Sequence, residues 1–97
     1  MAPREFRVRI DELLWEDERV EHIARHDVNP KEVEDVCFGL HLSRREKAGR
    51  YVLSGQSLQG RYLNVVVERI RNGLFRPVTA FEMSEKYKRR YRRRVRK

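Results

Sequence analysis

The chain has 97 residues, 39% of them charged and 39% hydrophobic, with a formal net charge of +8 and one cysteine. This length predicts a single domain over residues 1–97, and one cysteine excludes an intramolecular disulfide, so nothing in the sequence asks for an oxidising compartment. No apolar run approaches the roughly 20 residues that span a bilayer, and residues 1–5 lack the apolar part of a signal peptide, which predicts a soluble cytoplasmic protein without a membrane contact.

The N-terminal part predicts a short strand and then a helix. Residues 5–10 alternate between charged and apolar side chains, the pattern of an amphipathic strand added to the central sheet. A helix is expected over about residues 16–26, because its first turn is acidic and the helix dipole stabilises acids there. Val20, Ile23 and Ala24 recur at helical spacing and are expected to pack inward.

A second helix is predicted to begin after Asn29. Asn29 suits the N-cap, Pro30 suits the first helical position, and Glu32 can close a capping box with Asn29. Gly39 is expected to end this helix. Helical spacing places four apolar residues on its inner face: Val33, Val36, Cys37 and Leu40. Cys37 is therefore expected to be a buried structural thiol, and the two helices are expected to form an antiparallel pair over one face of the sheet.

Residues 50–81 form the centre of the expected fold, because they are rich in β-branched and aromatic residues. Three successive strands are predicted there, at residues 50–56, 61–69 and 74–81. Asn72-Gly73 predicts a type I′ hairpin turn, in which both residues have positive φ, so the strands should form an antiparallel meander. A further strand is expected over residues 41–46, with a turn at residues 47–49 that leads into the meander.

The C-terminal segment, residues 84–97, carries nine Lys or Arg residues and one Glu, and it is predicted to be a very basic helix or tail. Ser84 can cap its start, and Tyr87, Tyr91 and Val95 form a thin apolar stripe that can dock it. The expected order is β-α-α-β-β-β(-β)-α. This order predicts an α+β fold with helices on one face of a mainly antiparallel sheet and the other face open for function.

Charge is unevenly distributed along the chain. Residues 11–35 carry ten acids against three bases, whereas residues 36–83 carry three acids against eight bases. The positive charges of residues 84–97 repel one another, which favours a polyanionic partner at the sheet and tail. Contacts with nucleic acid are expected from basic and aromatic residues of these parts: Arg44, Arg45, Tyr62, Lys86, Lys88, Arg89, Arg90, Arg92 and Arg93.

The sequence contains no group of residues with the spacing of a known metal or cofactor site. His22 and His26 are four residues apart but lack the glutamate of the zincin pattern, and Cys37 adds no zinc spacing. There is no Gly-rich phosphate loop and no Gly-flanked nucleophilic serine. We therefore expect no cofactor and no metal.

The remaining residues suit cleavage of an RNA backbone without a metal. That reaction needs a base for the 2′-hydroxyl, fixed positive charge on the phosphate and an acid for the leaving oxygen. Phosphate clamps are expected from three arginines that converge across the sheet: Arg50, Arg61 and Arg76. His26 can act as base or acid, and Tyr91 as a proton donor or stacking group. Each also has an ordinary structural alternative, since helix-end histidines often serve as caps and strand arginines often pair with acids such as Glu68.

Several stretches follow one another in a characteristic order between residues 15 and 91. They are Trp15-Glu16, residues 21–28, residues 32–36, Arg50-Tyr51, Gly55-Gln56, residues 60–63, Thr79-Ala80, Glu85 and Tyr91. This series resembles the BrnT family, small toxins of type II toxin–antitoxin systems with a Trp-acidic start and a Lys/Arg-His-Gly-Val corner. The resemblance implies a RelE-like fold, a metal-independent ribonuclease activity on RNA and a ribbon-helix-helix antitoxin of the BrnA kind. It also implies assembly as a homodimer or as a toxin–antitoxin hetero-oligomer.

Two positions depart from the pattern of that family. Asp27 stands where the family usually has Gly, an exchange that is tolerated because Asp adopts left-handed conformations. Phe81 stands where the family commonly has Arg, which weakens the nuclease reading if that arginine acts in catalysis. Arg76 could replace it only from the same face of the strand. Five residues separate the two, which in a regular strand places them on opposite faces unless a bulge near Pro77 intervenes.

Three functions therefore stay open. The first is a ribonuclease toxin, and the second is a catalytically inactive member of the same fold that binds RNA or DNA. The third is a protein-interaction module whose basic tail docks an acidic partner. Loss of cleavage with little loss of binding on substitution of Arg50 or His26 would separate the first from the second.

Overall fold

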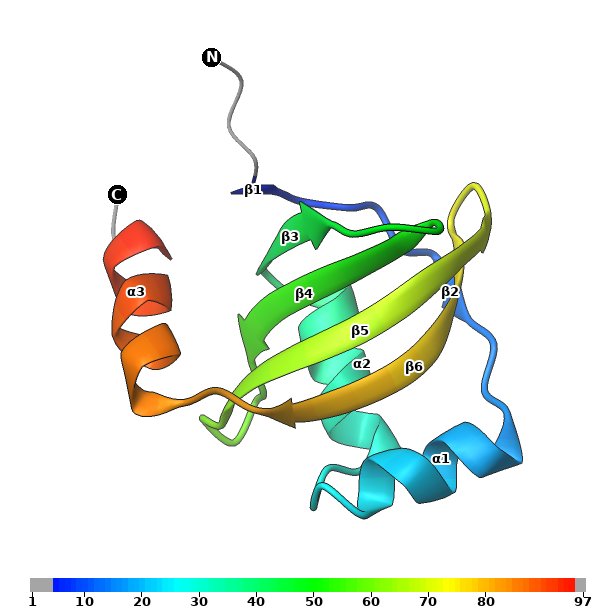
Figure 1. Cartoon of the computed structure of the whole chain (residues 1–97), viewed down its shortest axis with the longest axis horizontal. Coiled ribbons are helices and arrows are strands. Elements are labelled where there is room, and N and C mark those ends of the chain that lie inside the picture. The colour runs from blue at the N-terminus through cyan, green and yellow to red at the C-terminus, as the bar shows by residue number, and fades with distance from the viewer. Residues whose placement is uncertain (1–4, 96–97) are drawn as a thin grey trace.

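The computed structural model describes residues 5–95 (Figure 1). The elements in this range are β1 (Glu5–Phe6), β2 (Glu12–Leu13), α1 (Asp17–Ala24), α2 (Pro30–Phe38), β3 (His41–Arg45), β4 (Arg50–Gln56), β5 (Tyr62–Arg71), β6 (Leu74–Glu82) and α3 (Glu85–Val95). Within that part of the chain, no helix combines the length and the apolar character that crossing a membrane would need.

The strands form one sheet in the order β1-β3-β4-β5-β6-β2 (Figure 1). Strands β3 to β6 are antiparallel neighbours, which confirms the predicted meander. Strand β4 has the predicted bounds, whereas β5 continues to Arg71 and β6 to Glu82. The alternation of buried and accessible residues along β4 and β5 follows from the pleat, which turns successive side chains to opposite faces.

The hairpin turn between β5 and β6 differs from the prediction in its backbone. At the turn between β5 and β6 only Gly73 has a positive φ, of 80°, so the predicted type I′ turn at Asn72-Gly73 is wrong. Gly73 instead lies against the N-terminal segment, where its carbonyl accepts the backbone N–H groups of Asp11 and Glu12. Two consecutive positive φ values occur between β3 and β4, at Ala48 and at the glycine that follows it.

The N-terminal segment joins both edges of the sheet. Only Glu5–Phe6 of the strand predicted over residues 5–10 is a strand, and it pairs with β3. The chain then crosses to the other edge, where Glu12–Leu13 pairs in parallel with the start of β6. Ile10 is buried on the way, as its apolar position in the predicted strand indicated.

Helix α1 lies along the free edge of β6 rather than over the sheet (Figure 1). β2 pairs only with Leu74 and Phe75, so the rest of that edge is left for α1 to cover. The helix ends at Ala24, which is exposed, so the expectation that Ala24 packs inward is wrong, whereas Ile23 is fully buried. The turn after α1 contains Asp27 with a φ of 60°, as its left-handed tolerance predicted.

Helix α2 packs on β4 and β5 and starts as predicted (Figure 1). Asn29 Oδ1 accepts the Glu32 N–H at 2.9 Å, and the Glu32 carboxylate accepts the Asn29 N–H at 3.1 Å, which closes the capping box. Leu40 lies beyond the end of the helix and is 65% exposed, so it does not join the inner face. Because α1 covers an edge and α2 a face, the expected antiparallel helix pair over one face is not formed.

The core lies between α2, the inner side of α1 and one face of the sheet. Its fully buried residues come from helices and strands alike: Ile23, Val33, Val36, Leu53, Leu63, Val65, Val67 and Ala80. Cys37 is buried among them, and burial, with a smaller contribution from the charge of Glu34, raises the pKa of its thiol to about 12. A thiol with that pKa stays protonated near neutral pH, which agrees with a structural role.

Helix α3 follows β6 directly and is capped as predicted. The hydroxyl of Ser84 accepts the N–H of Tyr87 at 3.1 Å, and the Ser84 carbonyl accepts the N–H of Lys88. Tyr91 is buried, whereas Val95 is 39% exposed and adds little to docking. Together the elements give the predicted α+β fold, with one sheet face covered by α2 and the other uncovered except at the end where α3 lies (Figure 1).

Candidate nucleic-acid interface

The face of the sheet opposite α2, called the open face below, collects side chains from four strands. Leu53 of β4, Val65 of β5 and Ala80 of β6 point toward the core. Their neighbours along each strand therefore point to the opposite face. Figure 1 shows this face toward the viewer, with α3 at its left end. Its residues are Leu42, Arg44, Arg50, Val52, Ser54, Gln56, Tyr62, Asn64, Val66, Glu68, Arg76, Thr79 and Phe81.

Arg50, Glu68 and Arg76 form one row across β4, β5 and β6, because Glu68 is the register partner of both arginines. Arg76 is neutralised: its Nε lies 3.3 Å from Glu68 Oε1 and its Nη1 lies 3.0 Å from Glu16 Oε2. Arg50 is half-buried, and its buried Nε has no hydrogen-bond partner within the described chain. A buried donor without a partner costs about 1–3 kcal/mol, and an anion bound beside Arg50 would remove that cost.

A β-bulge brings Arg76 and Phe81 to the same face of β6. The register shifts by one residue between Val66 and Val67 of β5, which leaves Val78 of β6 as an extra residue. The extra residue changes the parity along the strand. The expectation for a regular strand, with Arg76 and Phe81 on opposite faces, therefore does not hold here: a bulge next to Pro77, the exception named above, places both on the open face.

Helix α1 and the turn that follows it place two histidines at the β6 edge of this face. His22 Nε2 lies 3.1 Å from Thr79 Oγ1, and the His26 ring lies 5.3 Å from the His22 ring and 6.5 Å from the Phe81 ring, between centroids. The β5 partners of Phe81 and Arg76 are four residues apart, which is about 13 Å along a strand. His26 therefore lies toward one end of the face, away from the arginine row, and His22 lies between them.

Tyr62 of β5 carries a group of cations and a second aromatic ring from α3. Lys88 Nζ lies 5.4 Å and Arg92 Cζ 5.1 Å from the centroid of the Tyr62 ring, and the Tyr91 ring packs edge-on at 5.9 Å. Burial, and to a smaller degree Tyr62, raises the pKa of Tyr91 above its ordinary value. The Tyr91 phenol is thus neutral at physiological pH, so it can donate a proton or hydrogen bond but cannot serve as a base.

A chain of hydrogen bonds fixes α3 against β3 and β4. Arg44 Nη1 donates to Tyr87 Oη at 3.1 Å, Tyr87 Oη lies 3.2 Å from Ser54 Oγ, and Ser54 Oγ donates to Asn64 Oδ1 at 2.7 Å. Ser54 has a single hydroxyl proton, which goes to Asn64, so Tyr87 is the donor to Ser54. Every donor in the chain therefore points along the sheet toward Asn64, which is buried like Ser54.

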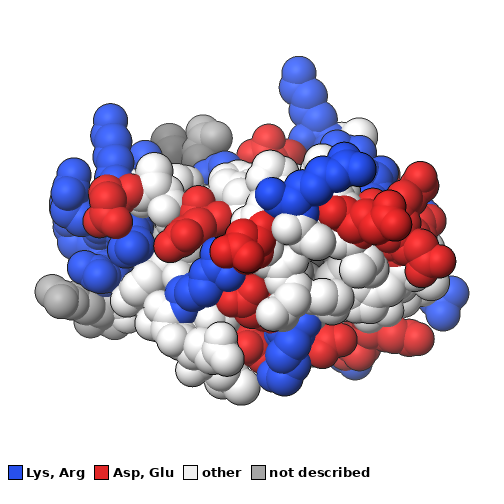
Figure 2. All heavy atoms as spheres, turned by 90° about the horizontal axis from the view of Figure 1, so that it is seen from below, with Lys and Arg blue, Asp and Glu red and all other residues white. Residues whose placement is uncertain are grey.

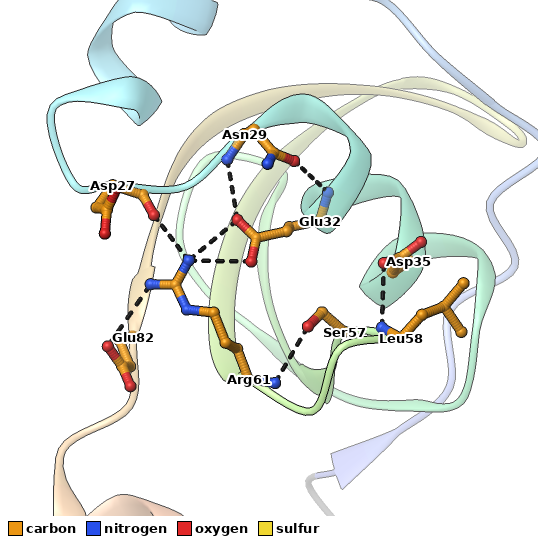
Figure 3. A network of polar contacts seen from close by, with 8 residues as sticks. All are labelled: Asp27, Asn29, Glu32, Asp35, Ser57, Leu58, Arg61 and Glu82. Carbon is orange, nitrogen blue, oxygen red and sulfur yellow. Dashed lines mark hydrogen bonds and ion pairs between the residues drawn. The ribbon is translucent and has the colours of Figure 1, made fainter.

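Arg61 lies on the helix side of the sheet and not on the open face (Figure 3). Its Nη1 donates to both carboxylate oxygens of Glu32 at 3.0 Å and to the carbonyl of Asp27 at 2.7 Å, and its Nη2 lies 3.6 Å from Glu82 Oε1. Burial acts to lower the pKa of Arg61, but the hydrogen bonds and charge of Glu32 outweigh it and the pKa is raised. The expected convergence with the other two arginines does not occur at Arg61, because buried Glu32 holds its guanidinium.

The predicted nucleic-acid contacts of the sheet are also divided between its faces. Arg44 lies on the open face, whereas Arg45 lies on the opposite face, with its Cζ 5.9 Å from the centroid of the Tyr51 ring. On α3, Lys88 and Arg92 lie over Tyr62, and four further predicted residues are exposed: Lys86, Arg89, Arg90 and Arg93.

Comparisons with models of protein families and with curated proteins find no match. A comparison with solved structures does find similar chains. The crystal structure of the Brucella abortus ribonuclease toxin BrnT aligns with a TM-score of 0.64, over 76% of this chain and 97% of that chain, at 14% sequence identity. The chain has the BrnT fold. The resemblance and the RelE-like α+β fold predicted from the sequence are thereby confirmed as a statement about fold.

On this BrnT fold the charges are separated along the molecule. Figure 2, which views the molecule from the side of α1, shows acidic residues over the middle and right and a dense group of Lys and Arg at the left end, where α3 lies. The acids of α1 include exposed Asp17, Glu18 and Glu21. The open face thus has a strongly positive boundary at α3 and an acidic boundary at α1.

Several residues of the open face were missed by reasoning from the sequence. His22 was considered only as a metal ligand, although its spacing from His26 was the signal that both share a side of α1. Ser54, Asn64 and Thr79 gave no signal, because a single polar residue in a strand does not reveal what it faces. The BrnT fold of this chain brings them together through strand register alone.

Proposed function

We propose that this protein is a metal-independent endoribonuclease, the toxin component of a type II toxin–antitoxin system, and that it binds RNA on the open face. The observation that carries the proposal is Arg50, whose buried Nε lacks a partner and which stands in one row with Arg76 on an uncovered sheet face. Similarity in fold to a ribonuclease toxin supports the proposal.

The residues of the open face have the properties that the reaction requires. Arg50 would hold the phosphate and stabilise the charge that develops on it, whereas Arg76, which is paired with Glu16 and Glu68, would hold Glu68 in the row. Tyr62, with Lys88 and Arg92 against its ring, would bind the neighbouring nucleotide through stacking and charge. Neutral Tyr91 is a candidate donor to the leaving oxygen.

Two histidines are candidates for the base that takes the proton of the 2′-hydroxyl. His26 was predicted from the sequence, and His22 lies nearer the arginine row through its contact with Thr79. Imidazole changes its protonation near neutral pH, which suits a general base. Arg61, whose guanidinium is bound by Glu32, would act by supporting the fold and not at the phosphate.

The proposed partners follow from the same face. A ribbon-helix-helix antitoxin of the BrnA kind would cover the open face and α3 in a toxin–antitoxin hetero-oligomer, and RNA would bind there once the antitoxin has left. The net charge of +8 favours both partners, since the RNA backbone and an acidic antitoxin segment are anionic. Such a toxin would act in the cytoplasm.

One observation favours a second candidate function, an inactive RNA-binding or interaction module of the same fold. Phe81 is 40% exposed on the open face and lies beside His26, where the BrnT-like pattern of the sequence commonly has an arginine. An aromatic ring can stack on a base, but it cannot stabilise negative charge on a phosphate.

The test is incubation of labelled single-stranded RNA with the protein in EDTA, beside the variants Arg50→Ala and Arg71→Ala. Arg71 is exposed at the end of β5, so Arg71→Ala is a control that removes the same charge from a position outside the arginine row. Cleavage by the wild type should persist in the chelator and fall by about a hundredfold in Arg50→Ala, the loss typical of one preorganised charge donor. Arg71→Ala should retain it.

Two other outcomes reject the proposal in different ways. Salt-sensitive RNA binding without cleavage would identify an inactive binder, with Phe81 as the residue to exchange. Absence of RNA binding at physiological salt would leave the protein-interaction module.

A further inference from the structure

A concave site on the opposite face from the proposed RNA site gathers four arginines. A cavity of about 550 Å³ lies between the N-terminal segment, the end of β3 and the turn between β5 and β6. Its lining includes Arg7, Arg9, Arg45, Arg69, Tyr51 and Phe75. Tyr51 and Phe75 belong to the core, so this cavity opens on the helix side of the sheet, beyond α2. The arginines come from three separate parts of the chain, and the fold alone brings them together.

The arginines of this cavity are poorly neutralised. Arg9 pairs with Asp11, with Arg9 Nε 3.1 Å from Asp11 Oδ1, and Asp11 is the only acid among the described residues of the lining. Arg7, Arg45 and Arg69 have no ion pair within residues 7–95. Like charges held within one Debye length, about 8 Å at physiological salt, repel one another. An anion bound in this cavity would therefore be attracted by several positive charges at once.

Contacts with uncharged groups hold two of these guanidinium groups in place. Arg45 Cζ lies 5.9 Å from the centroid of the Tyr51 ring, and Arg69 Nη2 donates to Asn72 Oδ1. A guanidinium has five N–H donors, so each of these contacts leaves donors for a ligand. Donors that are positioned before binding lose less freedom when the ligand arrives, which favours recognition of phosphate oxygens.

We propose that this cavity binds a small ligand with two linked phosphates, such as a nucleoside diphosphate or inorganic pyrophosphate. Its volume of about 550 Å³ falls within the range of about 300–1,000 Å³ of small-ligand sites. The site is a half-open hollow between three segments, whereas single-stranded nucleic acid generally follows an extended groove. The proposal concerns a different face from the arginine row and stands or falls independently of ribonuclease activity.

Isothermal titration calorimetry at low salt tests the proposal with three probes: ADP, pyrophosphate and adenosine. ADP and pyrophosphate should bind and adenosine should not. The double variant Arg7→Gln/Arg45→Gln should weaken both by about tenfold for each guanidinium removed, which corresponds to about 1.4 kcal/mol each. Both side chains are exposed, so folding should persist, which thermal melting verifies. Tighter binding of ADP than of pyrophosphate would identify a nucleotide as the ligand, and equal binding would identify the diphosphate group alone.

The matched control is Lys86→Gln/Arg89→Gln, which removes two charges from exposed positions of α3. An equal loss of ADP binding in this control would show attraction by net charge and overturn the proposal. Adenosine that binds as tightly as ADP, or failure of the wild type to bind either phosphate probe at millimolar concentration, would also overturn it. Displacement of ADP by a single-stranded RNA oligomer would assign the cavity to RNA and reject the small ligand.

Discussion

Arg61 and Arg50 lie on opposite faces of the same sheet and differ in what surrounds them. Arg61 contacts the carboxylates of Glu32 and Glu82 and a backbone carbonyl, so its charge is neutralised and its donors are used (Figure 3). Arg50 is half-buried but has a donor without a partner. The difference suggests that Arg61, whose donors are used by acids, holds the fold together, whereas Arg50 keeps a donor available for a ligand.

The same difference separates the two sides of the molecule as a whole. On the helix side the capping box, the Glu32–Arg61 pair and the hydrogen bonds of His41 join α2 to the loops and strands around it. On the open face, contacts are concentrated where α3 docks, and the arginine row beyond it stays uncovered (Figure 1). Substitutions on the helix side should therefore change stability, and those on the open face should change RNA chemistry.

The largest effect is expected for Arg61→Ala. This change leaves Glu32, which is 5% exposed, as a buried carboxylate without its cation. Breaking a buried pair on one side generally costs about 3 kcal/mol or more, so the free energy of unfolding should fall by about 3 kcal/mol. Urea denaturation followed by circular dichroism measures it.

Arg50→Ala is the control for that comparison. It removes the same type of side chain, but it leaves no buried acid unpaired and it removes a buried donor without a partner, so the free energy of unfolding should stay the same or rise by about 1 kcal/mol. Equal destabilisation by the two variants would show that Arg50 also holds the fold, and the contrast between the two faces would be lost.

The second effect is expected for Phe81→Arg. The bulge at Val78 places position 81 on the open face beside His26, so an arginine there would add positive charge at the end of the face that lacks it. RNA cleavage should rise by about thirtyfold, or about 2 kcal/mol of transition-state stabilisation. Initial rates on labelled RNA in EDTA measure it.

Phe81→Ala separates the two ways in which that gain could arise. If the aromatic ring merely blocks the site, the alanine variant should gain as much as the arginine variant. If the positive charge is what the site lacks, only Phe81→Arg should gain. No gain in either variant would remove position 81 from the proposed active region.

A third and smaller effect is expected for Tyr87→Phe. The change removes the hydroxyl that accepts from Arg44 and donates to Ser54, with the ring left in place. Two hydrogen bonds are lost and each contributes about 0.5–1 kcal/mol, so the free energy of unfolding should fall by about 1–2 kcal/mol. Hydrogen exchange of α3 should rise selectively, since this hydroxyl ties α3 to the sheet. Uniform faster exchange through β4 and β5 would instead show that the chain of hydrogen bonds belongs to the core.

Local sequence signals predicted most of the fold. The capping box at Asn29, the cap at Ser84 and the three central strands depend on neighbouring residues, and all were found. The position of α1 was missed, because it depends on which edge of β6 stays free after β2 has paired. The prediction of a type I′ turn at Asn72-Gly73 was also wrong, because the carbonyl of Gly73 accepts backbone N–H groups of the distant N-terminal segment, among them that of Asp11.

The candidate site was predicted less completely, because it depends on which face of a strand each residue occupies and on which residues are paired across neighbouring strands. The bulge at Val78 has no local signature, yet it decides which face carries Phe81. The partner of Arg61 could not be read from the sequence either, since Glu32 lies 29 residues away. Composition indicated correctly that positive charge collects at the C-terminal helix, because that property needs no tertiary information.

The smallest effect is expected from mild acid, because a single histidine on the helix side accounts for the expected loss of stability. The Nδ1–H of buried His41 donates to the Val36 carbonyl at 3.0 Å, so its Nε2 accepts the Val8 N–H at 3.4 Å and the ring is neutral. Burial, aided by the charge of Arg7 and opposed by these hydrogen bonds, lowers its pKa.

A histidine with a lowered pKa binds its proton more readily in the unfolded chain. The stability of the protein should therefore be unaffected by His41 well above about pH 6.5 and should fall as the pH drops below that value. Urea denaturation at pH 8 and pH 5.5 measures the difference, which should shrink in His41→Gln and persist in the exposed control His26→Gln. Arg50→Ala on the open face should leave this pH dependence intact, because an arginine stays charged throughout the pH range. A pH dependence that survives His41→Gln would place the acid-sensitive group elsewhere and weaken the view that the helix side alone sets stability.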